Sequence, residues 1–196
     1  THAGGRVWIR AFWILFLLCF ACFFAFIGLV AAGAFGKLPG VTELENPQSH
    51  LATEIYSADG VIMGKFFREN RSNVQYADLS PHLVNALVAT EDIRYYNHSG
   101  IDFKALVRAV TSLGKSGGGS TITQQLAKNL FHVRPDNTLE RIMQKFKEWV
   151  ISVKLERRYT KQEILTMYLN TVEFVNNAHG IKSAAQIYFN TTPDSL

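Results

Sequence analysis

The chain has 196 residues, of which 47% are hydrophobic and 18% are charged, and its formal net charge is +4. This length can hold one membrane segment and one globular domain, but it is too short for a second catalytic domain. The mild positive charge suits an anionic lipid surface or a pyrophosphate-bearing ligand. No long basic run interleaved with aromatic residues occurs, so a nucleic-acid partner is not expected.

The first feature along the chain is a long apolar segment. No charged residue occurs from Ala11 to Phe35, and these 25 positions exceed the roughly 20 that a helix needs to span a bilayer. Arg6 and Arg10 precede the segment and only Lys37 follows it closely, so the positive-inside bias places the N-terminus in the cytoplasm. We therefore predict a cytoplasmic N-terminus at 1–10, a transmembrane helix at 11–35, a linker at 36–51 and a domain at 52–196.

Two features of this segment have other interpretations. The run Ala32-Gly33-Ala34 resembles the cleavage site of a signal peptide, although the apolar stretch is longer than an ordinary signal core. Cys19 and Cys22 have the C-x-x-C spacing of a redox or metal pair. Because both cysteines lie inside the apolar segment without a second ligand pair, we interpret them as small lipid-facing residues.

After the linker, a strand at 53–56, a turn at 58–60 and a second strand at 61–67 predict a small β-hairpin. A helix should follow, with Ser80 as its N-cap, Pro81 at its first position and an apolar face at helical spacing: Leu83, Val84, Leu87 and Val88.

An acidic pair, Glu91 and Asp92, interrupts this apolar pattern. Glu91 lies one turn beyond Leu87 on the same face, which predicts a partly desolvated carboxyl group. Desolvation tunes a carboxyl group towards proton transfer, so Glu91 is the candidate general base. The alternative left open by this segment alone is a solvated acidic pair at the end of a helix.

A glycine-rich loop at 116–119 leads into Ser120, Thr121 and a helix that carries Gln124, Gln125 and Lys128. Backbone N–H groups and hydroxyls that converge at a helix N-terminus can bind an anion. The loop is not a P-loop, because no Gly-Lys-Ser or Gly-Lys-Thr follows at the required spacing. A plain connector is the alternative.

The next helix is predicted over 138–158. Its core stripe consists of Leu139, Ile142, Met143, Phe146, Val150 and Val153. Arg141, Lys145 and Glu148 stand at i, i+4 and i+7, so they share another side of the helix, either as a charge-paired surface or as a binding site. Thr160 and Glu163 form a capping box for a further helix that ends near Asn170 and carries an apolar face, which we interpret as scaffold.

Four motifs in this order resemble the peptidoglycan glycosyltransferases, the lysozyme-like domain at the front of class A penicillin-binding proteins. They are E-D-x-x-Y-x-x-H-x-G at 91–100, GGSTITQQLAKN at 118–129, KFKE at 145–148 and KQEILTMYLN at 161–170. The resemblance runs from Tyr56 to the last residue, and the membrane segment and linker also look like this family's N-terminus. It implies a mainly α-helical, lysozyme-like domain with a small β-hairpin, preceded by one transmembrane helix.

The resemblance also implies an activity, the polymerisation of lipid II into glycan strands with inversion and release of undecaprenyl pyrophosphate. Glu91 matches the family's base and Glu148 its second essential glutamate, while Lys128 and Lys145 match positions that act on the leaving pyrophosphate. The other residues expected at the substrate are Asp92, Tyr95, His98, Ser120, Thr121, Gln124, Gln125 and Arg141. For His98, a structural hydrogen bond is an equal alternative to proton transfer.

Two departures from the family pattern stand out. Gln144 occupies the position before Lys145 where the family commonly has arginine, and we hypothesise that Arg141, one turn earlier, supplies the missing cation. Family members also continue through more helices and a transpeptidase domain, so we expect the domain at 52–196 to be truncated at its C-terminal end.

The resemblance implies a divalent cation, Mg or Mn, as candidate cofactor with Glu148 as candidate ligand, and no organic cofactor. The expected partners are lipid II, the growing glycan strand, inner-membrane lipid and other cell-wall synthesis proteins, with the domain on the periplasmic side of a bacterial inner membrane. The alternatives are a lysozyme-like glycoside hydrolase, which has little use for Lys128 and Lys145, and a non-catalytic membrane-anchored scaffold, which has no need of Glu91 and Glu148.

Overall fold

The computed structural model describes residues 3–35, 53–56, 62–66, 73–112, 115, 118–131, 135–176 and 178–196. The predicted linker at 36–51, the hairpin turn and much of the glycine-rich loop lie outside the described residues. The described chain is mainly helical, with two small two-stranded sheets. The predicted fold class, mainly α with a small β-hairpin behind one apolar helix, is confirmed.

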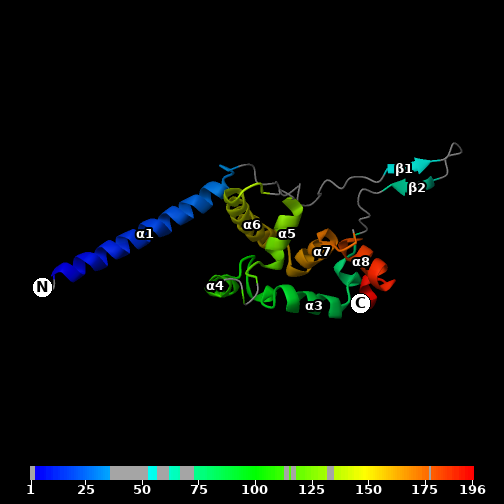
Figure 1. Cartoon of the computed structure of the whole chain (residues 1–196). Helices are drawn as coiled ribbons and strands as arrows, with labels where there is room; N and C mark the ends of the chain where they lie inside the picture. The colour runs from blue at the N-terminus through cyan, green and yellow to red at the C-terminus, as the bar shows by residue number, and fades with distance from the viewer. Residues whose placement is uncertain are drawn as a thin grey trace.

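The N-terminal helix α1 spans Ala3–Ala31, and a turn follows at 32–35. The helix therefore begins and ends earlier than the predicted 11–35. Its stretch Arg6–Ala31 is long and apolar enough to cross a membrane, and most of its side chains are exposed, unlike those of a buried core helix. Figure 1 shows α1 projecting from the body formed by the other helices.

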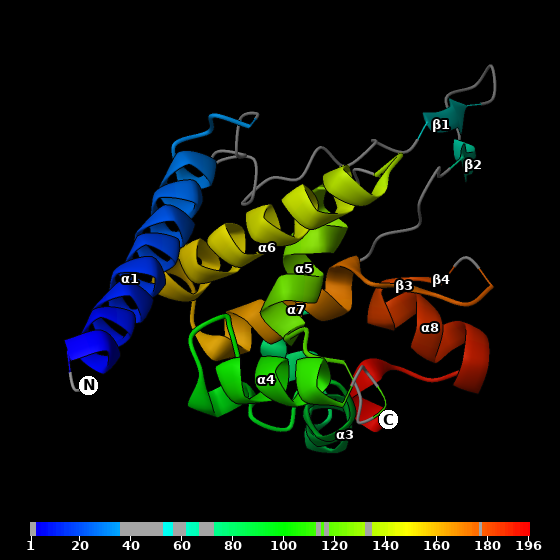
Figure 2. The same ribbon diagram turned by 60° about the vertical axis from the view of Figure 1, so that its left-hand side comes forward.

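The last turns of α1 pack against α6, which spans Thr138–Arg158. The ring of Phe146 lies 6.2 Å from that of Phe23 and 5.0 Å from that of Phe26, and it also contacts Trp149 at 5.5 Å, measured between ring centroids. The turned view in Figure 2 shows α1 and α6 side by side. Edge-to-face aromatic packing thus joins the apolar helix to the body.

The predicted hairpin is present as β1, Thr53–Tyr56, paired antiparallel with β2, Ile62–Phe66. Helix α3, Pro81–Glu91, begins as predicted, with the Ser80 hydroxyl accepting a hydrogen bond from the His82 backbone N–H. The short helices η1, Tyr76–Asp78, and η2, Tyr95–Asn97, flank α3, and α4, Phe103–Thr111, follows.

The core lies where α5, Ile122–Phe131, crosses α6 and α7, Lys161–Thr171. Its buried members are Val74, Leu79, Val84, Tyr95, Ile122, Leu126, Ala127, Ile151, Leu155, Ile164, Leu165, Tyr168, Leu169 and Ile181. The predicted stripe of α6 is wrong at its start, because Leu139 and Ile142 are 76% and 49% exposed. The first turns of α6 extend beyond the core, and its later turns provide the buried residues.

The chain closes with β3, Glu173–Phe174, paired with β4, Ala178–His179, and then with α8, Gly180–Phe189, and η3, Pro193–Ser195. Near the end of α7, the Asn170 amide binds both backbone groups of Val74 at 3.0 Å. This side chain therefore acts like a strand partner for a segment 96 residues earlier in the chain.

Candidate active site

Two adjoining cavities lie where α5 meets α3 and α6. The larger has a volume of about 870 Å³ and is lined by Ser120, Gln124, Gln125, Lys128, Asn129, Pro135, Arg141, Ile142, Gln144, Lys145 and Glu148. The smaller has a volume of about 360 Å³ and is lined by Ala89, Thr90, Glu91, Asp92, Ile93, Arg94, Asp102, Ala105, Arg108, Gly118, Ser120, Thr121 and Gln125. Ser120 and Gln125 line both, so the start of α5 separates the two cavities.

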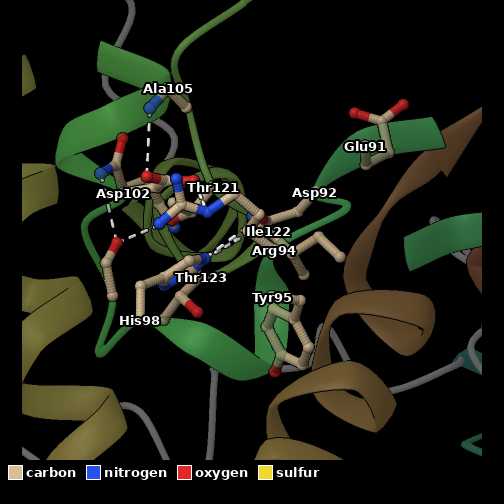
Figure 3. A network of polar contacts seen from close by, with 12 residues as sticks. Glu91, Asp92, Arg94, Tyr95, His98, Asp102, Ala105, Thr121, Ile122 and Thr123 are labelled. Carbon is tan, nitrogen blue, oxygen red and sulfur yellow. Dashed lines mark hydrogen bonds and ion pairs between the residues drawn. The ribbon is translucent and has the colours of Figure 1, made fainter. Parts of the chain in front are cut away.

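Glu91, the candidate base, is the last residue of α3 and is exposed at the smaller cavity. The predicted desolvation of this carboxyl group is therefore wrong, because α3 ends before its apolar face can bury the side chain. Figure 3 shows the carboxylate turned away from the polar network around Asp92. Its Oε2 instead accepts a hydrogen bond of 2.8 Å from the Gln125 amide on α5.

A third residue completes this chain of hydrogen bonds. The Tyr168 hydroxyl on α7 donates to Gln125 Oε1 at 3.1 Å. Burial, and then the charge of Glu91, raise the pKa of Tyr168 to about 12, so the hydroxyl keeps its proton. The sequence placed Tyr168 correctly on an apolar face, but nothing in the local pattern indicated that its hydroxyl reaches the site.

Asp92 is buried, and both of its carboxylate oxygens are occupied. They lie 3.1 and 3.0 Å from His98 Nε2, and Oδ2 also accepts from the Ile122 backbone N–H at 3.1 Å (Figure 3). The side chains of Asp92 and His98 are 5% and 4% exposed. Of the two interpretations of His98, the structure therefore favours the structural one: the pair fixes the loop after α3 to the start of α5.

The start of α5 is already capped by protein groups. Thr121 Oγ1 accepts from the Gln124 N–H and donates to the Gly100 carbonyl at 2.7 Å, and the Gln124 amide also donates to that carbonyl. Together with Asp92, which accepts from the Ile122 N–H, these contacts occupy two backbone donors at this helix N-terminus. The N–H groups of Ile122 and Gln124 are therefore not free for the anion that the sequence predicted here.

Tyr95 lies in the core and lines neither cavity. It is fully buried, its hydroxyl donates to the Lys161 carbonyl at 2.9 Å, and burial raises its pKa well above the ordinary value. The Lys161 ammonium lies 4.3 Å from the ring centroid and donates to the His98 carbonyl. Tyr95 and His98 therefore pack beneath the site, and neither lines the two cavities.

The charged row on α6 faces the larger cavity as predicted. Lys145 Nζ lies 3.0 Å from Glu148 Oε2 and 2.8 Å from Ser120 Oγ. Glu148 is 7% exposed, whereas the Lys145 side chain is 40% exposed. The buried carboxylate thus holds an accessible ammonium at the cavity wall, where it can meet a negatively charged group.

Lys128 and Arg141 are exposed and line the same cavity from α5 and α6. Three cations from two helices therefore face one space, and Gln144 lines it beside them. Asn129 and Ile142 also line it. Asn129 belongs to the second motif but was not predicted as a site residue, and Ile142 was predicted to lie in the core. Arg108 on α4 adds a cation to the smaller cavity. The sequence pattern predicts only that Arg108 is exposed on a helix, not that it lines a cavity.

The described residues contain no group of three or more His, Cys, Asp or Glu side chains arranged to hold a metal ion. Among the described residues that line the larger cavity, Glu148 is the one carboxylate, and it is paired with Lys145. A single carboxylate fits Mg²⁺ only where substrate phosphates and waters supply the remaining ligands.

Asp102 supports the floor of the smaller cavity (Figure 3). Its Oδ1 caps α4 by accepting from the N–H groups of Lys104 and Ala105, and its Oδ2 lies 3.4 Å from Arg94 Nε. Burial alone would raise the pKa of this carboxyl, but the two N–H donors and the guanidinium together hold it below the ordinary value.

The chain can now be compared with known proteins. The family model described as Transglycosylase matches residues 59–196. Penicillin-binding protein 1A of Escherichia coli (strain K12) is 40% identical over 164 residues, which is 82% of this chain and 19% of that protein. The Neisseria gonorrhoeae protein of the same name is 39% identical over 183 residues, or 88% of this chain and 22% of that protein.

A third relative, penicillin-binding protein 1A of Aquifex aeolicus (strain VF5), is 41% identical over 170 residues, or 84% of this chain and 23% of that protein. The chain thus spans about a fifth of the length of the curated relatives that it matches. Because the family model covers most of the chain and includes both cavities, this chain belongs to the transglycosylase family.

Proposed function

We propose that this chain is a peptidoglycan glycosyltransferase that polymerises lipid II into glycan strands. The observation that carries the proposal is the arrangement of the two cavities on either side of Ser120 and Gln125. One cavity presents the exposed carboxylate of Glu91, and the other presents cations held beside Glu148. A reaction that removes a proton at one point and releases a pyrophosphate at another needs these two environments next to each other.

In the proposed reaction, Glu91 is the base. The 4-hydroxyl oxygen of the acceptor sugar forms a bond to the anomeric carbon of the donor while its proton passes to Glu91. The bond from that carbon to the pyrophosphate oxygen breaks, and its electron pair leaves with the pyrophosphate. One displacement inverts the anomeric centre, as in inverting glycosidases, with a sugar hydroxyl in place of water. Because Glu91 is exposed, the bound substrates themselves must exclude water from it.

The cations of the larger cavity stabilise the leaving group. Charge grows on the pyrophosphate as its bond breaks, and preorganised cations lower the energy of that transition state. Lys145 is held in place by Ser120 and Glu148, and Lys128 and Arg141 line the same wall. A divalent ion would add charge neutralisation at the pyrophosphate, with Glu148 as its one protein carboxylate.

The apolar helix supports a membrane location. A substrate carried on a polyprenyl chain stays in the bilayer, so an enzyme anchored by α1 meets it without leaving the membrane. Arg6 and Arg10 at the start of α1 favour a cytoplasmic N-terminus, and this supports the proposal that the cavities lie on the periplasmic side of the inner membrane. The growing glycan strand and other cell-wall synthesis proteins are the partners that follow from this location.

The direct test is polymerisation of fluorescent lipid II by the 196-residue chain in detergent, beside the Glu91→Gln variant, with and without Mg²⁺. We expect long glycan products from the wild type and at least a hundredfold lower rate from the variant. Equal product from both would remove Glu91 from the mechanism. Release of soluble fragments from preformed peptidoglycan would indicate a hydrolase, and lipid II left unreacted by both proteins would count against glycosyl transfer by this 196-residue chain.

A further inference from the structure

The hydroxyl of Tyr168 is directed from the core towards the candidate base. The residue is 5% exposed and its ring belongs to the buried cluster of α5, α6 and α7. A phenylalanine would fill that place equally well by packing alone. The hydroxyl instead donates at 3.1 Å to Gln125 Oε1, on the neighbouring helix.

The Gln125 amide is held at both ends. Its oxygen accepts from Tyr168, and its nitrogen donates to Glu91 Oε2 at 2.8 Å. These two contacts define which end of the amide faces the carboxylate, because a flipped amide would present its oxygen to Glu91 and its nitrogen to the tyrosine hydroxyl. The Tyr168 hydroxyl carries its proton at neutral pH, as any tyrosine does, and burial raises its pKa further, so it stays available as a donor.

The side chain of Glu91 needs a hydrogen-bond partner that restricts its rotamers. It lies at the last position of α3, is exposed, and has the Gln125 amide as its hydrogen-bond donor. An exposed glutamate at a helix end samples several rotamers, whereas a general base must lie within hydrogen-bond reach of the proton that it removes.

We propose that Tyr168 is a positioning residue for the general base: its hydroxyl orients the Gln125 amide, and this amide holds the Glu91 carboxylate at the smaller cavity. The inference deepens the proposed function and rests on it. Tyr168 touches no reacting atom in this scheme and acts through Gln125 alone.

The first test is the Tyr168→Phe variant, which keeps the ring and removes only the hydroxyl. A neutral hydrogen bond contributes roughly 1 kcal/mol, so we expect kcat for lipid II polymerisation to fall about three- to tenfold while KM stays unchanged. Tyr188→Phe is the matched control, because it removes a hydroxyl that donates to the Val175 carbonyl, and neither residue lines the two cavities. A Tyr168→Phe enzyme with wild-type kcat would overturn the proposal.

A double-mutant cycle separates positioning from general loosening of the core. If Tyr168 acts through Gln125, the Tyr168→Phe change has no further effect on kcat in a Gln125→Ala background. If the effects of Tyr168→Phe and Gln125→Ala on kcat instead multiply in the double variant, Tyr168 does not act through Gln125, and the proposal is wrong.

A third measurement does not depend on turnover. The side-chain amide of Gln125 gives ¹⁵N–¹H resonances that can be assigned from their absence in Gln125→Ala. We expect both Glu91→Gln and Tyr168→Phe to shift these resonances and Tyr188→Phe to leave them in place. Shifts in this experiment with no polymer from the wild type would count against the proposed function alone, whereas unshifted resonances in Tyr168→Phe would overturn the positioning role.

Discussion

The carboxylate of Asp92 accepts a hydrogen bond of 3.1 Å from the backbone N–H of Ile122. The residue that follows the candidate base is therefore fastened to the first residue of α5, the helix that separates the two cavities. His98 binds the same carboxylate at 3.0 Å. Asp92 thus fixes the backbone at Glu91 relative to α5, the helix that carries Gln125.

The Asp92→Ala change should lower stability as well as activity. It leaves two buried donors, His98 Nε2 and the Ile122 N–H, without an acceptor, which costs about 2–5 kcal/mol of unfolding free energy. Urea unfolding in detergent measures this loss. The control is Asp136→Ala, an exposed aspartate before α6, for which we expect less than about 1 kcal/mol. Equal stabilities of the two variants would contradict the structural role of Asp92.

Arg141→Ala should weaken use of the substrate, because Arg141 lines the larger cavity beside Gln144, which stands where the family resemblance implies a cation. A charge-assisted contact contributes roughly 1.5–3 kcal/mol, so kcat/KM should fall about tenfold or more. Gln144 lines the same cavity, and adding Gln144→Arg should restore most of the loss. Lys154→Ala, an exposed lysine further along α6, is the control. An Arg141→Ala enzyme with wild-type kinetics would disprove the compensating role.

Asp102 should make the free energy of unfolding depend on pH in the acidic range. Its pKa is lowered in the folded chain, so its charged form stabilises the fold above the ordinary pKa of about 3.9, and this contribution is lost as the pH falls through the folded pKa. We expect the difference in unfolding free energy between wild type and Asp102→Ala to be constant above about pH 5 and to shrink below the ordinary value. Urea unfolding between pH 7 and pH 3 measures it, and a difference that stays constant throughout would show that the cap acts without its charge.

Gly100→Ala should be strongly destabilising. Gly100 has φ +90°, and a Cβ there would lie 2.9 Å from the backbone carbon and oxygen of Ser152 on α6. The left-handed conformation alone costs about 1–3 kcal/mol for a residue with a side chain, and the backbone contact adds to it. Gly118→Ala is the matched control, since its Cβ would meet nothing within 4 Å. Thermal unfolding of both variants tests this, and similar melting temperatures would contradict the close approach.

Local signals in the sequence predicted correctly where α3 and α7 begin. The Ser80 cap and the Thr160–Glu163 capping box depend on residues at most three positions apart, and both are present in the structure. The row Arg141, Lys145 and Glu148 was also predictable, because helical periodicity alone puts its members on one side.

The rest of the site depends on how distant helices pack, which no local pattern contains. Tyr168 and Gln125 are 43 positions apart, and their contact exists only because α7 crosses α5. The burial of Tyr95 and His98 follows from the same packing, so two residues predicted to bind substrate lie beneath the cavities and do not line them. The prediction that the Glu91 carboxyl group is partly desolvated was wrong because α3 ends at that residue.

Phe146 occupies the position next to Lys145 on α6, and its ring lies against Phe26 of α1. One turn of helix therefore has the anchor on one side and the cation that faces the cavity on the other. In the proposed enzyme, with α1 as its membrane anchor, this turn ties the position of the larger cavity to that of the anchor.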